Sequence, residues 1–171
     1  MTLEWIFYFA AAIAFVASVK VVTGENAIHA LLYLVVSLLA VAMCFYLLGA
    51  PFAAGLEVIV YAGAILVLFV FAVMMFDLQG DRQPAVFQQS WSATWLGPVA
   101  LTFTLAILLT YILLNGTFDK GIEPGIVGAK QVGIALYGPY LLAVEIASFL
   151  LLAGLIAGYH FAKYSTQGEH R

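Results

Sequence analysis

Charged residues are scarce in this sequence of 171 residues: 9% are Asp, Glu, Lys or Arg, whereas 65% are hydrophobic. A typical soluble domain carries about 25% charged residues, and a soluble fold of this length exposes much of its surface to water. The shortage of charge therefore excludes a soluble single-domain enzyme. The net charge of −3 and the lack of a basic stripe also exclude a nucleic-acid-binding protein.

Cysteine is almost absent as well. Cys44 stands alone inside an apolar run, so the sequence has no disulfide framework and no cysteines spaced for a metal. With nothing electropositive beside it in the sequence, Cys44 is interpreted as a buried apolar side chain and not as a reactive thiol. The sequence also lacks a phosphate-binding loop, a GxGxxG motif and a CxxC motif. We therefore expect the chain to have no catalytic residues of its own and to bind no cofactor and no metal.

Long apolar runs are what the sequence does have, and they predict an all-α polytopic membrane protein. About 20 consecutive apolar residues cross the hydrocarbon core of a bilayer, and continuous runs disfavour the alternating pattern of a β-barrel. A single membrane domain over residues 1–171 is expected, with polar loops at 77–92 and 115–138. The five predicted transmembrane helices cover about residues 3–22, 28–48, 52–76, 93–114 and 139–161.

The basic residues predict how the chain is oriented in the membrane. Four of them lie on one side of the predicted bilayer and two on the other, namely Lys20, Arg82, Lys163 and Arg171 against Lys120 and Lys130. Cytoplasmic loops carry an excess of Lys and Arg. The N-terminus is therefore expected outside and the C-terminus in the cytoplasm. The sequence shows no internal repeat, which disfavours an inverted-repeat transporter.

Two carboxylates, Glu57 and Glu145, lie within predicted spans. Inserting an acidic residue at the centre of a membrane helix costs roughly 2.5–3.5 kcal/mol of free energy. The first hypothesis for such a residue is therefore a functional role. No Lys or Arg lies inside any span, and desolvation then favours the neutral acid, which suits proton uptake and release. Each carboxylate lies roughly 8–9 Å along its helix, so a shared polar layer is possible. The alternative is a protonated glutamate that donates a hydrogen bond to a neighbouring helix.

Tyr61 and Gly63 follow Glu57 on the same predicted helix. Glu57 and Tyr61 are four residues apart and share a face of an α-helix, and the Tyr61 hydroxyl can both donate and accept in a chain of water molecules. Gly63 permits close helix approach or local unwinding, including a π-bulge. From the sequence alone a packing seam of small residues is the favoured interpretation. The candidate residues for a proton path or gate are Glu57, Tyr61, Gly63 and Glu145.

Three blocks of sequence resemble one known family. Residues 30–40, 56–75 and 138–148 are similar to the second, third and fifth helices of subunit J of the proton-pumping NADH:quinone oxidoreductase, respiratory complex I. The mitochondrial counterpart of that subunit is the sixth core membrane subunit. The resemblance covers nearly the whole chain, and its block in the third helix is long and specific.

The resemblance implies a non-redox, multi-pass subunit in the membrane arm of the complex, in the inner (cytoplasmic) membrane of a bacterial cell. It implies that the subunit helps couple NADH:quinone oxidoreduction to proton translocation, through a polar path and a gating third helix. In that family the third helix switches between α and π forms near the Tyr-Ala-Gly segment, here Tyr61-Ala62-Gly63. Subunits A, H and K and the lipid bilayer are the implied partners, and no nucleic acid is expected.

Catalysis is then expected of the complex and not of the isolated chain. The complex is expected to use FMN, iron–sulfur clusters, NADH and a quinone, none of them bound by this chain. A purely structural membrane-arm subunit, whose intramembrane glutamates donate interhelical hydrogen bonds, is the alternative. A self-contained small transporter or channel is a third hypothesis, disfavoured by the missing repeats and filter motifs.

Overall fold

The computed structural model describes residues 2–24, 26–77, 91–114 and 126–168, and within these ranges it contains helices and no strands. Five of these helices are long and apolar enough to cross a membrane, which confirms the all-α polytopic prediction. The candidate spans are Glu4–Thr23, Ala27–Leu47, Pro51–Met75, Trp95–Leu114 and Leu141–Phe161. The chain forms two compact units, residues 1–127 and 128–171.

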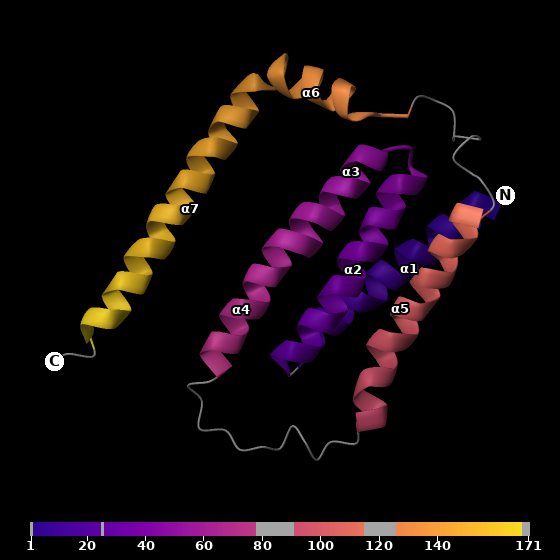
Figure 1. Ribbon diagram of the computed structural model, residues 1–171, viewed down its shortest axis with the longest axis horizontal. Helices are drawn as coiled ribbons and strands as arrows, with labels where there is room; N and C mark the ends of the chain where they lie inside the picture. The colour runs from indigo at the N-terminus through magenta and orange to yellow at the C-terminus, as the bar shows by residue number, and fades with distance from the viewer. Residues whose placement is uncertain (1, 25, 78–90, 115–125, 169–171) are drawn as a thin grey trace. The chain divides into compact units, whose positions relative to one another are not determined.

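The core of the first unit lies among α1 (Thr2–Thr23), α2 (Ala27–Leu47) and α5 (Trp91–Leu114), which run side by side in Figure 1. Buried side chains recur every three or four residues, so they form one stripe along α1 and one along α2. Fully buried alanines in both stripes let the two backbones approach closely. The core residues are Ile6, Ala10, Ile13 and Ala17 of α1, Val36, Ala40, Met43 and Leu47 of α2, and Leu105 and Ile112 of α5.

A hydroxyl pair crosses the α1–α2 interface beside the alanines. The Ser37 hydroxyl donates to the carbonyl of Ala14 at 3.3 Å, which leaves its oxygen to accept from Ser18 at 2.8 Å. Water is absent from the hydrocarbon layer, so polar groups there must find partners within the protein. Interhelical hydrogen bonds of this kind contribute about 0.6 kcal/mol on average, and this one fixes the register of α1 against α2.

Local sequence signals define both ends of α2. The side chain of Asn26 accepts hydrogen bonds from the backbone N–H groups of Ile28 at 3.0 Å and His29 at 3.5 Å, and so caps the start of the helix. At the other end Gly49 has a φ of 82°, in the left-handed region that glycine tolerates. Pro51 then begins the next helix, so α2 and the third span are joined by a tight turn, in agreement with the short gap between the predicted spans 28–48 and 52–76.

Gly97 of α5 makes room for Tyr33 of α2. A Cβ added at Gly97 would meet the Tyr33 hydroxyl directly. Gly97→Ala is therefore expected to displace the Tyr33 side chain and to destabilise the packing of α5 on α2 by about 1 kcal/mol, the lower end of the usual cost of overpacking, because the atom it meets is at the end of a side chain that can shift. The check is the midpoint of thermal unfolding of the purified protein in detergent. Gly55→Ala is the control, because nothing lies within 4 Å of a Cβ there, and equal midpoints for the two variants would contradict the prediction.

The second unit contains α6 (Ala129–Tyr137) and α7 (Leu141–Gly168). Helix α6 lies within the predicted loop 115–138, whose glycines exclude a long helix but leave space for nine residues between Gly128 and Gly138. Figure 1 shows α6 turned across the end of α7. The corner requires glycine, because a Cβ on Gly138 would lie 2.7 Å from the carbonyl oxygen of Ile134.

Candidate functional site

The third span changes its helical form midway. It begins as α3 (Pro51–Leu56), continues as the π-helix η1 (Glu57–Ile65) and ends as α4 (Leu66–Asp77). At the end of η1 the N–H of Leu66 donates to the carbonyl of Tyr61, five residues earlier. π-Helical segments are rare and frequently mark functional sites. Three of the four candidate residues, Glu57, Tyr61 and Gly63, lie within this segment.

Glycine at position 63 fits the π form. A Cβ at this position would lie 3.3 Å from the carbonyl oxygen of Val58, five residues earlier. Glycine avoids that close contact, and it also carries the weakest preference for a regular α-helix apart from proline. The sequence allowed two interpretations of Gly63, a packing seam of small residues and a local unwinding of the helix, and it favoured the packing seam. The local unwinding is present in the structure.

Glu57 is the buried acid of this segment. It is the first residue of η1, and 9% of its surface is exposed. The segment packs against α2, inside the first unit. Within the described part of the chain the Glu57 carboxyl has no hydrogen bond and no ion pair. A carboxyl group in this position needs polar partners from water or from another chain.

Tyr61 lies at the surface of the same segment. It is 53% exposed, so its side chain is open to whatever surrounds the first unit at this depth. A phenol hydroxyl can donate one hydrogen bond and can also accept hydrogen bonds. The segment thus presents a buried carboxyl and an accessible hydroxyl within five residues of each other along the chain.

Glu145 belongs to the other compact unit. It lies in α7, four residues after the start of that helix, and its side chain is exposed within the unit. The prediction of a polar layer shared by Glu57 and Glu145 stays a prediction.

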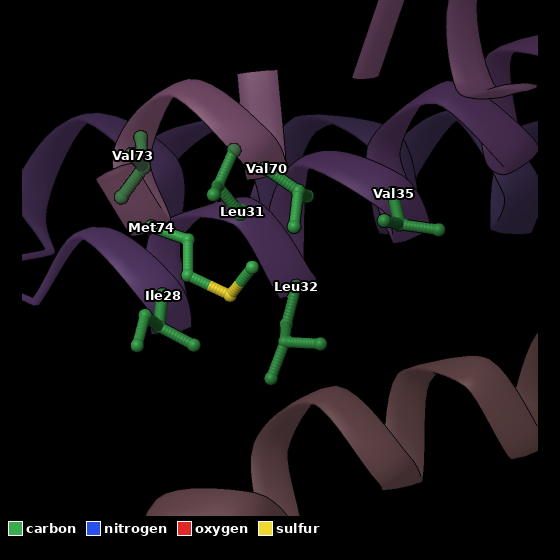
Figure 2. A pocket seen from close by; sticks show the side chains of 7 residues that line it. All are labelled: Ile28, Leu31, Leu32, Val35, Val70, Val73 and Met74. Carbon is green, nitrogen blue, oxygen red and sulfur yellow. The ribbon is translucent and has the colours of Figure 1, made fainter. Parts of the chain in front are cut away.

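An apolar groove of about 300 Å³ lies between α2 and α4, beyond η1 along the span (Figure 2). The α2 wall consists of Ile28, Leu31, Leu32 and Val35. The α4 wall consists of Val70, Val73 and Met74. These side chains offer no strong hydrogen-bond donor or acceptor, so the groove suits alkyl groups and not a polar ligand. Sequence reasoning missed it, because a groove depends on which turns of two helices face each other.

His29 is a polar group that the sequence analysis did not include in the site. Its Nδ1 atom is buried and has no hydrogen-bond partner in the described ranges. The imidazole lies edge-on to Trp95 of α5, with ring centroids 6.2 Å apart and an interplanar angle of 80°. Over the same ranges no three His, Cys, Asp or Glu side chains lie together as possible metal ligands. The donor set of these residues therefore does not fit an iron–sulfur cluster.

A family model and several similar proteins all indicate the same family for this chain. Residues 17–161 match the family described as NADH-ubiquinone/plastoquinone oxidoreductase chain 6. A protein of Pseudomonas aeruginosa named NADH-quinone oxidoreductase subunit J is 53% identical over 165 residues, covering 94% of this chain and 97% of the relative. The protein of the same name from Escherichia coli K12 is 47% identical over 167 residues, covering 98% of this chain and 90% of the relative. A third, from Buchnera aphidicola of Schizaphis graminum, is 42% identical over 163 residues, covering 94% and 98%.

Proposed function

Because the chain belongs to the NADH-ubiquinone/plastoquinone oxidoreductase chain 6 family, we propose that it helps couple NADH:quinone oxidoreduction to proton translocation as a non-redox subunit of the membrane arm. Its relatives are subunits of NADH-quinone oxidoreductase, and this chain is a subunit of the same enzyme. The oxidoreductase reaction belongs to the whole complex. FMN and the iron–sulfur clusters reside on other subunits, and this chain handles protons.

The observation that carries the proposal is a buried acid inside a π-helical segment of a membrane span. Glu57 takes up and releases the proton, since a carboxyl with no cationic neighbour in its span is readily neutralised. Tyr61 extends the path as a donor and acceptor in a chain of water molecules. Gly63 lets the backbone change between π and α hydrogen bonding, which opens and closes that chain. Glu145 supplies a second carboxyl from α7.

The same proposal includes the neighbouring subunits of the chain and its location in the cell. It places subunits A, H and K of the complex beside this subunit, in the inner (cytoplasmic) membrane of a bacterial cell, with the N-terminus outside. The large apolar side chains that remain exposed on α4 and α7 support a position in the membrane, because they need lipid or neighbouring subunits as partners.

Tyr61→Phe tests the path with a minimal change. Loss of the hydroxyl removes one link of the water chain, at a cost of about 1 kcal/mol in a hydrogen bond. We expect proton translocation per NADH to fall by up to about fivefold, with assembly unchanged. The measurements are proton uptake by inside-out membrane vesicles, NADH:quinone turnover, and the yield of complex on native gels.

Tyr159→Phe is the matched control, because Tyr159 is an exposed tyrosine of α7 outside η1. It should leave proton translocation per NADH at the wild-type level. A Tyr61→Phe enzyme that pumps at the wild-type ratio would contradict the proposed path. A loss of activity that only follows a loss of assembled complex would favour the purely structural subunit.

A further inference from the structure

One exposed face of α6 combines a basic, an aliphatic and an aromatic side chain. Lys130, Ile134 and Tyr137 are spaced by four and three residues, so they lie along a single stripe of the helix. Ile134 is 65% exposed and Tyr137 is 75% exposed. Lys130 makes no ion pair within the described ranges. We call this stripe the α6 face.

The position of α6 along the chain brings this face to the membrane boundary. The apolar span of α7 begins at Leu141, and a hydrogen-bonded turn joins the two helices. The N–H of Tyr140 donates to the carbonyl of Ala135 at 3.1 Å, and the N–H of Leu141 donates to the carbonyl of Gly138 at 3.3 Å. Helix α6 turns across the end of α7 (Figure 1). It therefore leaves the axis of the span next to Leu141, where the apolar stretch begins.

We propose that the α6 face lies in the interfacial layer of the lipid bilayer, where Ile134 and Tyr137 enter the acyl boundary and Lys130 binds a lipid phosphate. Tyrosine is enriched at this depth because its ring is apolar and its hydroxyl is polar. A lysine flanked by apolar side chains extends its aliphatic stem along them and places the ammonium group among the headgroups. Large apolar side chains are likewise exposed along α7.

Composition favours lipid over a protein partner for this face. Lysine is depleted at the cores of protein–protein interfaces, whereas aromatic side chains are enriched there. A protein surface covering the α6 face would have to desolvate the Lys130 ammonium or supply a carboxylate to it. The headgroup layer already holds phosphate groups and water at this depth, so Lys130 is accommodated there without an added partner.

Photo-crosslinking in the assembled complex tests the proposal. A benzophenone amino acid is introduced at position 134 in one variant and at position 132 in another, and both are irradiated in native membranes. Val132 is half-buried and lies about 200° around the helix from Ile134, two residues away. Mass spectrometry is expected to find phospholipid adducts at position 134 and few at position 132. Adducts of position 134 only with another protein chain, or equal lipid adducts at both positions, would overturn the proposal.

The charge of Lys130 is tested in nanodiscs of phosphatidylethanolamine and phosphatidylglycerol that hold the intact complex. With the photo-crosslinker at position 134, Lys130→Gln should lower the share of phosphatidylglycerol among the adducts by up to about fivefold. Lys130→Arg keeps the charge and should leave that share unchanged. A share unaffected by Lys130→Gln would overturn the phosphate contact. Proton translocation is not the readout, so this test can fail independently of the proposed coupling function.

Discussion

Replacing Glu57 with glutamine should reduce proton translocation by about tenfold or more, because proton transfer by a positioned acid or base typically contributes factors of a hundred or more. Glutamine keeps the size and hydrogen-bonding shape of the side chain but cannot release a proton. Glu57 is buried in the first unit, and because glutamine has nearly the same volume the substitution is expected to leave the packing of η1 intact. NADH:quinone turnover should fall with pumping if the two processes are tightly coupled.

The measurement compares proton uptake by vesicles with NADH oxidation, at equal amounts of assembled complex. Glu4→Gln is the control, because Glu4 is an exposed carboxylate in the first turn of α1. That change removes a negative charge without touching the site. If Glu57→Gln pumps as well as Glu4→Gln does, Glu57 is not part of the proton path.

Gly63→Ala is expected to have the second largest effect, because it acts on the backbone form of η1. In the π form the Cβ of alanine would lie 3.3 Å from the carbonyl oxygen of Val58. This close contact disfavours the π form and shifts the segment towards the α form. A gate that must visit both forms then works more slowly, so turnover and pumping should decline together by several-fold.

A density map of the intact variant complex checks the cause directly. The map should show the N–H of Leu66 bonded to Ala62 and no longer to Tyr61, its partner in the π form. Gly55→Ala is the control, since that position lies in α3 and a Cβ there meets nothing within 4 Å. Wild-type turnover in a Gly63→Ala complex whose third span is shown to be α-helical would rule out gating by this segment.

The sequence predicts those parts of the structure whose cause is local. Continuous apolar runs determine the five spans, and Asn26 and Gly49 determine where α2 begins and ends, because capping and positive φ depend on single residues. The position of Glu57 in a span likewise follows from its place in an apolar run. Its burial depends on how η1 packs in the first unit, which the order of residues does not show.

The π form of η1 and the short helix α6 are harder to predict for different reasons. A π segment and an α-helix that contains one glycine can have the same amino-acid composition. The free energies of the two forms differ by about that of a few weak contacts. Helix α6 is nine residues long, below the length at which helix propensity alone is decisive. The sequence signals for α6 are the bounding glycines Gly128 and Gly138 and the capping residue Gln131, whose side-chain oxygen accepts from the N–H of Gly128 at 3.2 Å.

The π-helix of the third span also determines in which direction around the helix axis the later side chains of the span point. Each residue of an α-helix advances by about 100° around the axis, so a turn that accommodates one additional residue offsets all later side chains by about that angle. Val70, Val73 and Met74 face α2 across the groove with this offset in place (Figure 2). Return of η1 to the α form would swing these three side chains away from α2. The shape of an apolar surface near one end of the span therefore depends on the hydrogen-bonding pattern around Tyr61.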